Sequence, residues 1–157
     1  MNLLEAMELE LKAVNEIIVA TRNLIAKKPG VLNHEQVRKK IRDECSEDLH
    51  YIVDLLLVSA HNRTRYAHAF GMADEGTSCS HPMGCKSTKL NEEEESILLK
   101  FKLQKLLDLF TFQKEHLLPE SCGGTRNADN MKWWCALHNR QKQDALAWWL
   151  AEQGDIP

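Results

Sequence analysis

Cysteine and histidine residues gather in and beside two stretches of the sequence that lack a helical pattern. The first group is Cys79, His81 and Cys85, and the second is Cys122, Cys135 and His138. Zinc takes four thiolate or imidazole ligands in a tetrahedron, usually as close pairs from two parts of a chain. One hypothesis is therefore a structural zinc ion bound by Cys79, Cys85, Cys122 and Cys135, with His81 or His138 as substitutes.

The same cysteines have two other interpretations, because Cys79 and Cys85 are farther apart in the sequence than the usual ligand pair. They can stay reduced as free thiols, or they can form a disulfide with each other. The five cysteines are odd in number, and the acidic N-terminus does not resemble a secretory signal. Reduced thiols or a metal site are therefore expected ahead of a disulfide framework, with a cytoplasmic location. Cys45 is assigned to the core.

A second set of polar residues lies on one face of the helix predicted over 47–70. Its residues 51–60 are apolar except for Asp54, and a buried carboxylate is costly unless it is paired or binds a metal. Helical spacing brings Glu47, His50 and His61 near the face that holds Asp54. The set predicts a metal-dependent catalytic site. The plainer alternative is a structural polar stripe at a helix interface, or a half-solvated face where Asp54 pairs with Arg or Lys from another helix.

All four tryptophans fall in the predicted last helix, as the pairs Trp133-Trp134 and Trp148-Trp149. Adjacent residues of a helix point in different directions, so at least one indole is expected to be partly exposed. Trp and Arg are favoured anchors of protein interfaces. Trp133, Trp149 and Arg140 are therefore the predicted partner-binding residues, with core packing and base stacking as alternatives.

The helices predicted to position these groups cover about residues 2–28, 33–46, 47–70, 92–117 and 130–152. In the first, apolar residues recur at alternating steps of three and four, which predicts one buried stripe that Pro29-Gly30 ends. Asn33 and Asn91 are predicted N-caps of later helices. The expected fold is a single all-α domain, a bundle of four to five helices whose loops over 71–89 and 119–129 carry Cys and His.

Composition limits the classes of partner. The chain of 157 residues has a formal charge of −3, from 20 basic and 23 acidic residues, whereas nucleic-acid binding usually needs a basic excess. The longest strongly apolar run, Tyr51–Ala60, falls well short of the ~20 residues that cross a bilayer. No membrane association is expected, and nucleic-acid binding ranks low.

The motifs of common enzyme classes are missing from the sequence. It has no glycine-rich phosphate loop, no Gly-x-Ser-x-Gly and no His-Glu-x-x-His. The leading hypothesis is therefore a small cytoplasmic regulatory or adaptor protein that binds another protein, with zinc as a structural cofactor. The alternatives are a metal-dependent enzyme built on the helix over 47–70 and, third, a nucleic-acid-binding regulator. The stripe of the first helix could also close a homodimer.

Overall fold

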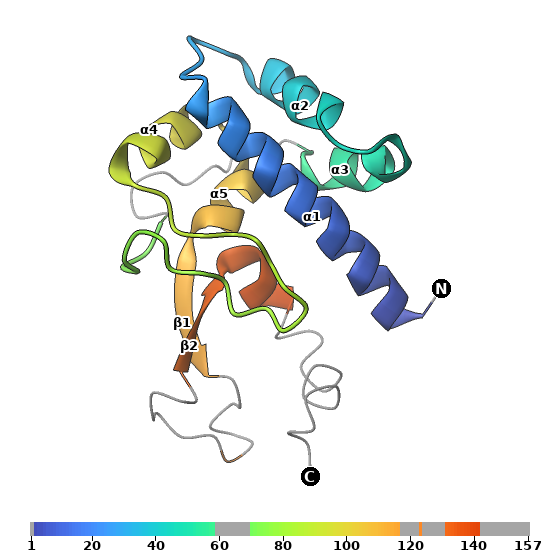
Figure 1. Ribbon diagram of the computed structural model, residues 1–157, viewed down its shortest axis with the longest axis vertical. Helices are drawn as coiled ribbons and strands as arrows, with labels where there is room; N and C mark the ends of the chain where they lie inside the picture. The colour runs from blue at the N-terminus through green and yellow to red at the C-terminus, as the bar shows by residue number, and fades with distance from the viewer. Residues whose placement is uncertain (1, 59–69, 117–122, 124–130, 142–157) are drawn as a thin grey trace.

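The structure is a computed structural model that describes residues 2–58, 70–116, 123 and 131–141. These residues are mostly helical, with a two-stranded antiparallel sheet (Figure 1). In chain order the elements are α1 (Leu3–Ala26), α2 (His34–Asp43), the 3-10 turn η1 (Glu47–Leu49), α3 (His50–Leu56), α4 (Glu92–Lys100), α5 (Gln104–Phe110), β1 (Phe112–His116) and β2 (Met131–Cys135). Residues 136–141 are helical. Within the described residues, no helix is long and apolar enough to cross a membrane.

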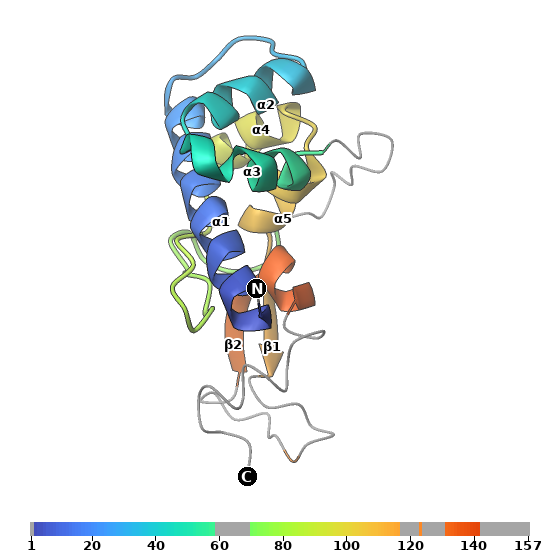
Figure 2. The ribbon, with the colours of Figure 1, turned by 90° about the vertical axis from the view of Figure 1, so that its right-hand side faces the viewer.

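Helix α1 forms the centre of the packing and contacts α2, α3 and α4. These three helices gather toward one end of α1, and the hairpin extends at the opposite end of the molecule (Figures 1 and 2). The predicted stripe of α1 is buried at Leu11, Val14, Ile18 and Ile25. The helix prediction is confirmed, and its apolar stripe packs within the chain.

The second predicted helix is confirmed in type and in its cap. Asn33 is the N-cap of α2, its side chain accepts a hydrogen bond from the Gln36 amide, and the Gln36 side chain accepts one from the Asn33 amide. Val37 and Ile41 face the core and are fully buried. The helix ends at Asp43, three residues before the predicted boundary.

The helix predicted over 47–70 begins where expected but does not run through. After η1, α3 ends at Leu56, and Leu57 and Val58 leave the helical conformation. No glycine or proline marks this end, so the sequence pattern contains no stop signal there. Residues 59–69 lie outside the described part of the chain.

The prediction of one helix over 92–117 is wrong. Helix α4 stops at Lys100, Lys102 takes the left-handed conformation with φ of 56°, and α5 follows. The chain then becomes extended as β1 at Phe112. The leucines that suggested one long helix are instead buried on two short helices that bend around the core, where Leu98 and Leu106 are both fully buried.

The helix predicted over 130–152 starts instead as a strand, so the all-α prediction holds only in part. β2 pairs antiparallel with β1, with Phe112 opposite Cys135 and Lys114 opposite Trp133. Aromatic residues favour strands, and the pairing contributes hydrogen bonds that sequence periodicity does not reveal. Trp134 is fully buried at this strand. Residues 142–157 lie outside the described residues.

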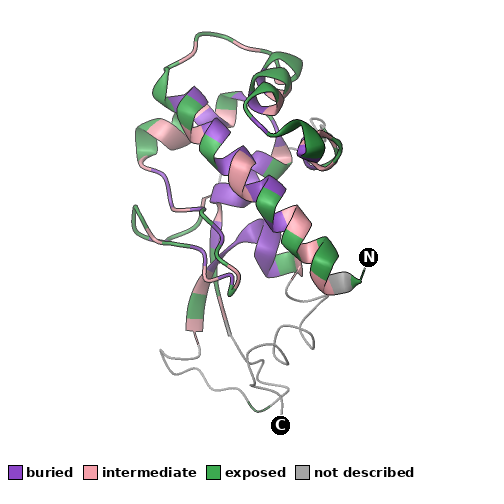
Figure 3. Cartoon of the chain, turned by 45° about the vertical axis from the view of Figure 1, so that its right-hand side comes forward, coloured by how far each residue is buried: buried purple, intermediate pink, exposed green. Residues whose placement is uncertain are grey.

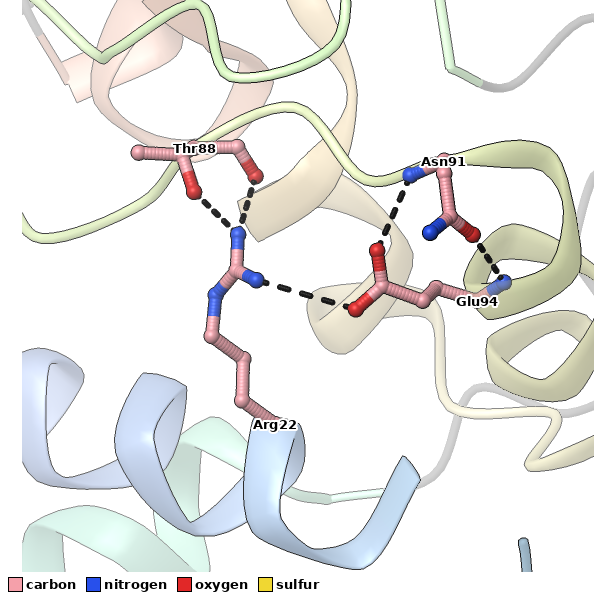
Figure 4. A network of polar contacts seen from close by, with 4 residues as sticks. All are labelled: Arg22, Thr88, Asn91 and Glu94. Carbon is pink, nitrogen blue, oxygen red and sulfur yellow. Dashed lines mark hydrogen bonds and ion pairs between the residues drawn. The ribbon is translucent and has the colours of Figure 1, made fainter. Parts of the chain in front are cut away.

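A polar network holds the end of the 71–89 loop against α1 (Figure 4). The guanidinium of Arg22 in α1 donates to the Thr88 carbonyl at 2.9 Å and to the Thr88 hydroxyl, and lies 3.8 Å from the Glu94 carboxylate. That carboxylate also accepts from the amide of Asn91, the predicted N-cap of α4. Burial concentrates along the inner side of α1, on α5 and on residues 136–139 (Figure 3).

Candidate metal centre

Four buried side chains converge between the 71–89 loop and the end of β2. They are Cys79, Cys85, Cys135 and His138, and their ligand atoms all lie within 4.8 Å of one another. Two come from the loop, one ends β2, and one lies on the helical residues that follow. Among the described residues this is the one group of at least three Cys, His, Asp or Glu side chains that could hold a metal ion.

The loop folds back on itself so that its two cysteines meet. Ser78 and Thr88 form an isolated antiparallel bridge, and the Cys79 amide donates to the Ser87 carbonyl at 3.1 Å. At the tip, the Gly84 amide donates to the His81 carbonyl at 3.0 Å, and Gly84 takes a φ of 93°. A residue with a Cβ adopts that conformation only with strain, so glycine suits the position.

The hairpin supplies the other two groups by a change from strand to helix. Cys135 is the last residue of β2, and residues 136–141 are helical. His138 is therefore about one helical turn beyond Cys135, on the same side. The loop and the strand are joined next to the cluster, because the Ser80 amide donates to the Trp133 carbonyl at 2.9 Å. In Figure 1 the green loop accordingly runs beside β2.

Two distances between the ligand atoms are close to those around a tetrahedral ion. The Nδ1 of His138 lies 3.3 Å from the Cys135 sulfur and 3.8 Å from the Cys79 sulfur. Around zinc, with Zn–S near 2.3 Å and Zn–N near 2.0–2.1 Å, a sulfur and a nitrogen ligand are about 3.6 Å apart. The two distances bracket this value. The arrangement could hold a metal such as zinc without large movement of the backbone.

Backbone amides point at two of the sulfurs. The Cys135 amide donates to the Cys79 sulfur and the Ser87 amide donates to the Cys85 sulfur, each at 3.4 Å. Such donors stabilise the negative charge of a thiolate ligand and fix its direction. Cys79, Cys85 and Cys135 are all more than nine-tenths buried. This burial shields the cluster from water and from exchange with other thiols.

In the metal-free protein the pKa values of the three cluster thiols differ strongly from one another. Hydrogen bonds from the Cys135 and Cys85 thiols lower the pKa of Cys79 far below its usual value. For Cys85, the bond with Cys135 is outweighed by the bond with Cys79 and by burial, which together raise its pKa to about 12. Burial, followed by the interactions with Cys79 and Cys85, raises the pKa of Cys135 well above its usual value.

His81, one of the two predicted substitutes, lies beside the cluster but not in it. Its ring is edge-on to His138 with 4.5 Å between the ring centres, and its Nδ1 accepts from the Met83 amide at 3.1 Å. Burial, and then the nearby His138, lower the pKa of His81 to about 4. The ring therefore packs against the ligand His138 as a neutral group.

Three predicted ligands thus lie together, and His138, the other substitute, completes the group. The spacing Cys135-x-x-His138 was the signal for it in the sequence. Cys122 lies outside the described residues. Cys45 is a core residue, as predicted: it is buried, its thiol donates to the Ile41 carbonyl, and burial raises its pKa to about 11. The described cysteines form no disulfide.

The residues proposed for a catalytic site on the third helix each make a separate contact. Asp54 is half exposed and pairs with Arg42 of α2 at 2.9 Å, which is the plainer of the two readings of its position. The His50 ring bonds to the Cys45 carbonyl at 2.9 Å, and Glu47 is exposed. His61 lies outside the described residues. The described members form no metal-binding group.

The predicted partner-binding residues are divided between strand and helix. Trp133 is on β2, half-buried, with the Lys114 ammonium 5.8 Å from its ring centre. Arg140 is exposed and pairs with the buried carboxylate of Asp108. Trp149 lies outside the described residues.

Searches against protein-family models, curated proteins and solved structures found no match for this chain.

Proposed function

We propose that this chain is a small regulatory or adaptor protein that acts by binding another protein, and that a structural zinc ion joins its 71–89 loop to its β-hairpin. The observation that carries the proposal is the buried group of three cysteines and one histidine. Thiolate and imidazole ligands suit zinc, whereas magnesium and calcium require oxygen ligands.

The ligand set supports a structural rather than a catalytic ion. Catalytic zinc sites keep one position open for water or substrate, whereas structural sites fill all four positions with protein ligands. Here Cys79, Cys85, Cys135 and His138 supply four, and each is more than nine-tenths buried. An ion at this position would connect parts of the chain that lie far apart in sequence, which is the role of a structural metal.

The exposed face of α3 supports a role in protein binding. Tyr51 and Leu55 are 57% and 67% exposed and lie one helical turn apart, and Val58, just beyond the end of the helix, is 56% exposed. Large apolar side chains that stay in solvent together on a helix are typical of a surface that a partner covers. The buried face of the same helix is already used by Val53 and Leu56.

Metal content of the native protein tests the zinc half of the proposal. Native mass spectrometry of the full chain is expected to find one zinc ion per molecule. The Cys135→Ser variant should lose it, and Cys45→Ser, a matched change of a buried cysteine outside the cluster, should keep it. Zinc that stays bound in Cys135→Ser, or protein purified without metal whose thiols all react freely, would contradict the proposal.

Two further variants separate this function from the alternatives. Asp54→Ala is expected to keep its zinc, because Asp54 pairs with Arg42 on the surface. Loss of metal from this variant while the fold persists would favour the catalytic hypothesis. Leu55→Glu should also keep its zinc. In cells of the source organism, this variant should lose the cross-links that join α3 to partner proteins. Cross-links that persist at the same positions would argue against this binding face.

A further inference from the structure

A groove separates the loop that joins α1 to α2 from the end of α4. Its volume is about 580 Å³, within the range of sites that bind a ligand. One wall is formed by residues 29–34, and the other by Ile97, Lys100, Phe101 and Lys102. It lies at the opposite end of α1 from the hairpin (Figure 1), so it is distinct from the metal centre.

Apolar side chains make up much of the groove. Phe101 is almost fully buried, and Leu32 and Ile97 are partly exposed toward solvent. Val31 is fully exposed. Folding alone therefore leaves a branched apolar side chain in water beside an apolar surface. An occupant of the groove would bury this area and gain the corresponding hydrophobic free energy.

The loop wall also offers backbone groups. Residues 29–32 have no regular secondary structure, and in the described structure the amides of Gly30, Val31 and Leu32 donate no hydrogen bond. The next amide, that of Asn33, is already capped by Gln36. These amides can therefore donate hydrogen bonds to the backbone of a bound peptide.

The charge of the groove selects the kind of peptide. Lys100 and Lys102 line it, both are exposed, and neither has a carboxylate partner in the part of the chain that the structure describes. By contrast, Lys28 at the end of α1 pairs with Glu93 at 3.1 Å. The groove thus holds two positive charges that the fold does not neutralise, next to an apolar floor.

We propose that this groove binds an extended segment of a partner protein in which an acidic residue stands beside a large apolar residue. This inference rests on the proposed function as a protein-binding adaptor, and it names the chemistry of the segment that is bound. A small molecule fits less well, because half of the groove lining is exposed, whereas small-molecule sites enclose most of their ligand. A peptide uses the apolar floor, the amides of the loop and the lysines together.

The test uses the full zinc-loaded chain, immobilised and panned against a phage library of random peptides. Enriched sequences are expected to place Asp or Glu next to Leu, Ile, Phe or Trp. The most enriched peptide, synthesised with a fluorescent label, is then titrated by fluorescence polarisation. The double variant Lys100→Glu/Lys102→Glu should bind it about tenfold more weakly, because two attractive contacts become repulsive. Added salt should weaken wild-type binding.

The matched control carries the same change of charge elsewhere. Lys40 and Lys132 are exposed and lie outside the groove, so Lys40→Glu/Lys132→Glu should bind within about twofold of wild type. A Val31→Ser variant, which reduces the apolar rim without a change of charge, should also bind more weakly. Enrichment of peptides without acidic residues, or equal losses in the two double variants, would overturn the proposal, as would a groove occupied by a second copy of the chain in solution.

Failure of the groove to bind peptides can be distinguished from failure of the proposed function. Both double variants should remain folded and retain one zinc ion, since neither removes a ligand of the cluster. Peptides that bind normally to Lys100→Glu/Lys102→Glu but not to Leu55→Glu would reject the groove while keeping the adaptor function. Absence of any enriched peptide from zinc-loaded protein would reject the groove as a peptide site.

Discussion

The sulfur of Cys79 and the Nδ1 of His138 lie 3.8 Å apart although 59 positions separate them in the chain. Between them run the rest of the loop, α4, α5 and the hairpin. A bond through a metal at this point closes a long segment, and closing a long segment removes many unfolded conformations. The cluster is therefore placed where a single ion can stabilise a large part of the fold.

Removal of the metal is expected to lower thermal stability by about 10 °C. Free zinc at about a thousand times its dissociation constant contributes about 4 kcal/mol to folding. In a chain of this size, each 1 kcal/mol shifts the unfolding temperature by about 2–4 °C. Differential scanning calorimetry with and without a strong chelator measures the change. In Cys135→Ser the chelator should have no effect, whereas Cys45→Ser should respond as wild type does.

Binding of zinc at neutral pH is expected to release about two protons. The raised pKa values of Cys85 and Cys135 keep both as thiols in the metal-free protein, while the lowered pKa of Cys79 leaves it a thiolate. Zinc binds thiolates, so the two protons must leave. Affinity should therefore rise with pH, by about a hundredfold per unit near pH 7. Calorimetric titration in buffers of different ionisation enthalpy counts the protons, and release of none would contradict the assignment of these ligands.

The part of the fold that sequence predicted well depends on local signals. The stripe of α1 follows the helical period, and the reciprocal bonds of Asn33 with Gln36 are formed by neighbouring residues. Each signal acts within a few residues, so it persists in any fold that contains the helix. Asn91 predicted the start of α4 for the same reason.

The hairpin could not be predicted in this way. Its strands are joined by residues 117–130, a connection far longer than the two-residue turn that marks a hairpin in a sequence, and the leucines before β1 follow a helical spacing up to Phe110. The pairing depends on tertiary packing, because Phe112 and Trp134 are each fully buried and the register places them on opposite faces of the hairpin. Propensity in a strand depends strongly on such tertiary context.

The metal centre also combines residues that the sequence alone could indicate with one that depends on the folded chain. Residue type and position led from the sequence to Cys79, Cys85 and Cys135, because they lie in or beside two long connections that need something to order them. Choosing His138 over His81 required the strand-to-helix change after Cys135, which turns one imidazole toward the sulfurs. That change belongs to the hairpin, and the sequence pattern had indicated a continuous helix.

Gly71→Ala is expected to destabilise the protein more than Gly76→Ala, although both glycines have positive φ, of 75° and 83°. A Cβ at Gly76 meets open space, so its cost is the left-handed strain alone, about 1 kcal/mol. A Cβ at Gly71 would collide with the Phe112 carbonyl at the start of β1, for a total of about 2–4 kcal/mol. Urea denaturation of the two variants gives the comparison, and equal midpoints would show that β1 moves aside freely.

Arg140→Ala is expected to cost about 1–2 kcal/mol of folding free energy. The Asp108 carboxylate is only 10% exposed and receives bonds from Arg140 and from Gln104, so truncation of the arginine leaves a buried charge with one partner. The arginine itself is 60% exposed, which keeps the cost well below that of a fully buried pair. Chemical denaturation measures the difference from wild type.

The matched control for this ion pair is Lys39→Ala, which removes the exposed pair with Asp43 on α2. Water solvates both of those groups, so the change should be much smaller than that of Arg140→Ala. The double variant Arg140→Ala/Asp108→Asn should recover part of the stability lost in Arg140→Ala, because a neutral amide needs no cation. If Arg140→Ala and Lys39→Ala cost the same, the exposure of the arginine decides the energy and the burial of Asp108 contributes nothing.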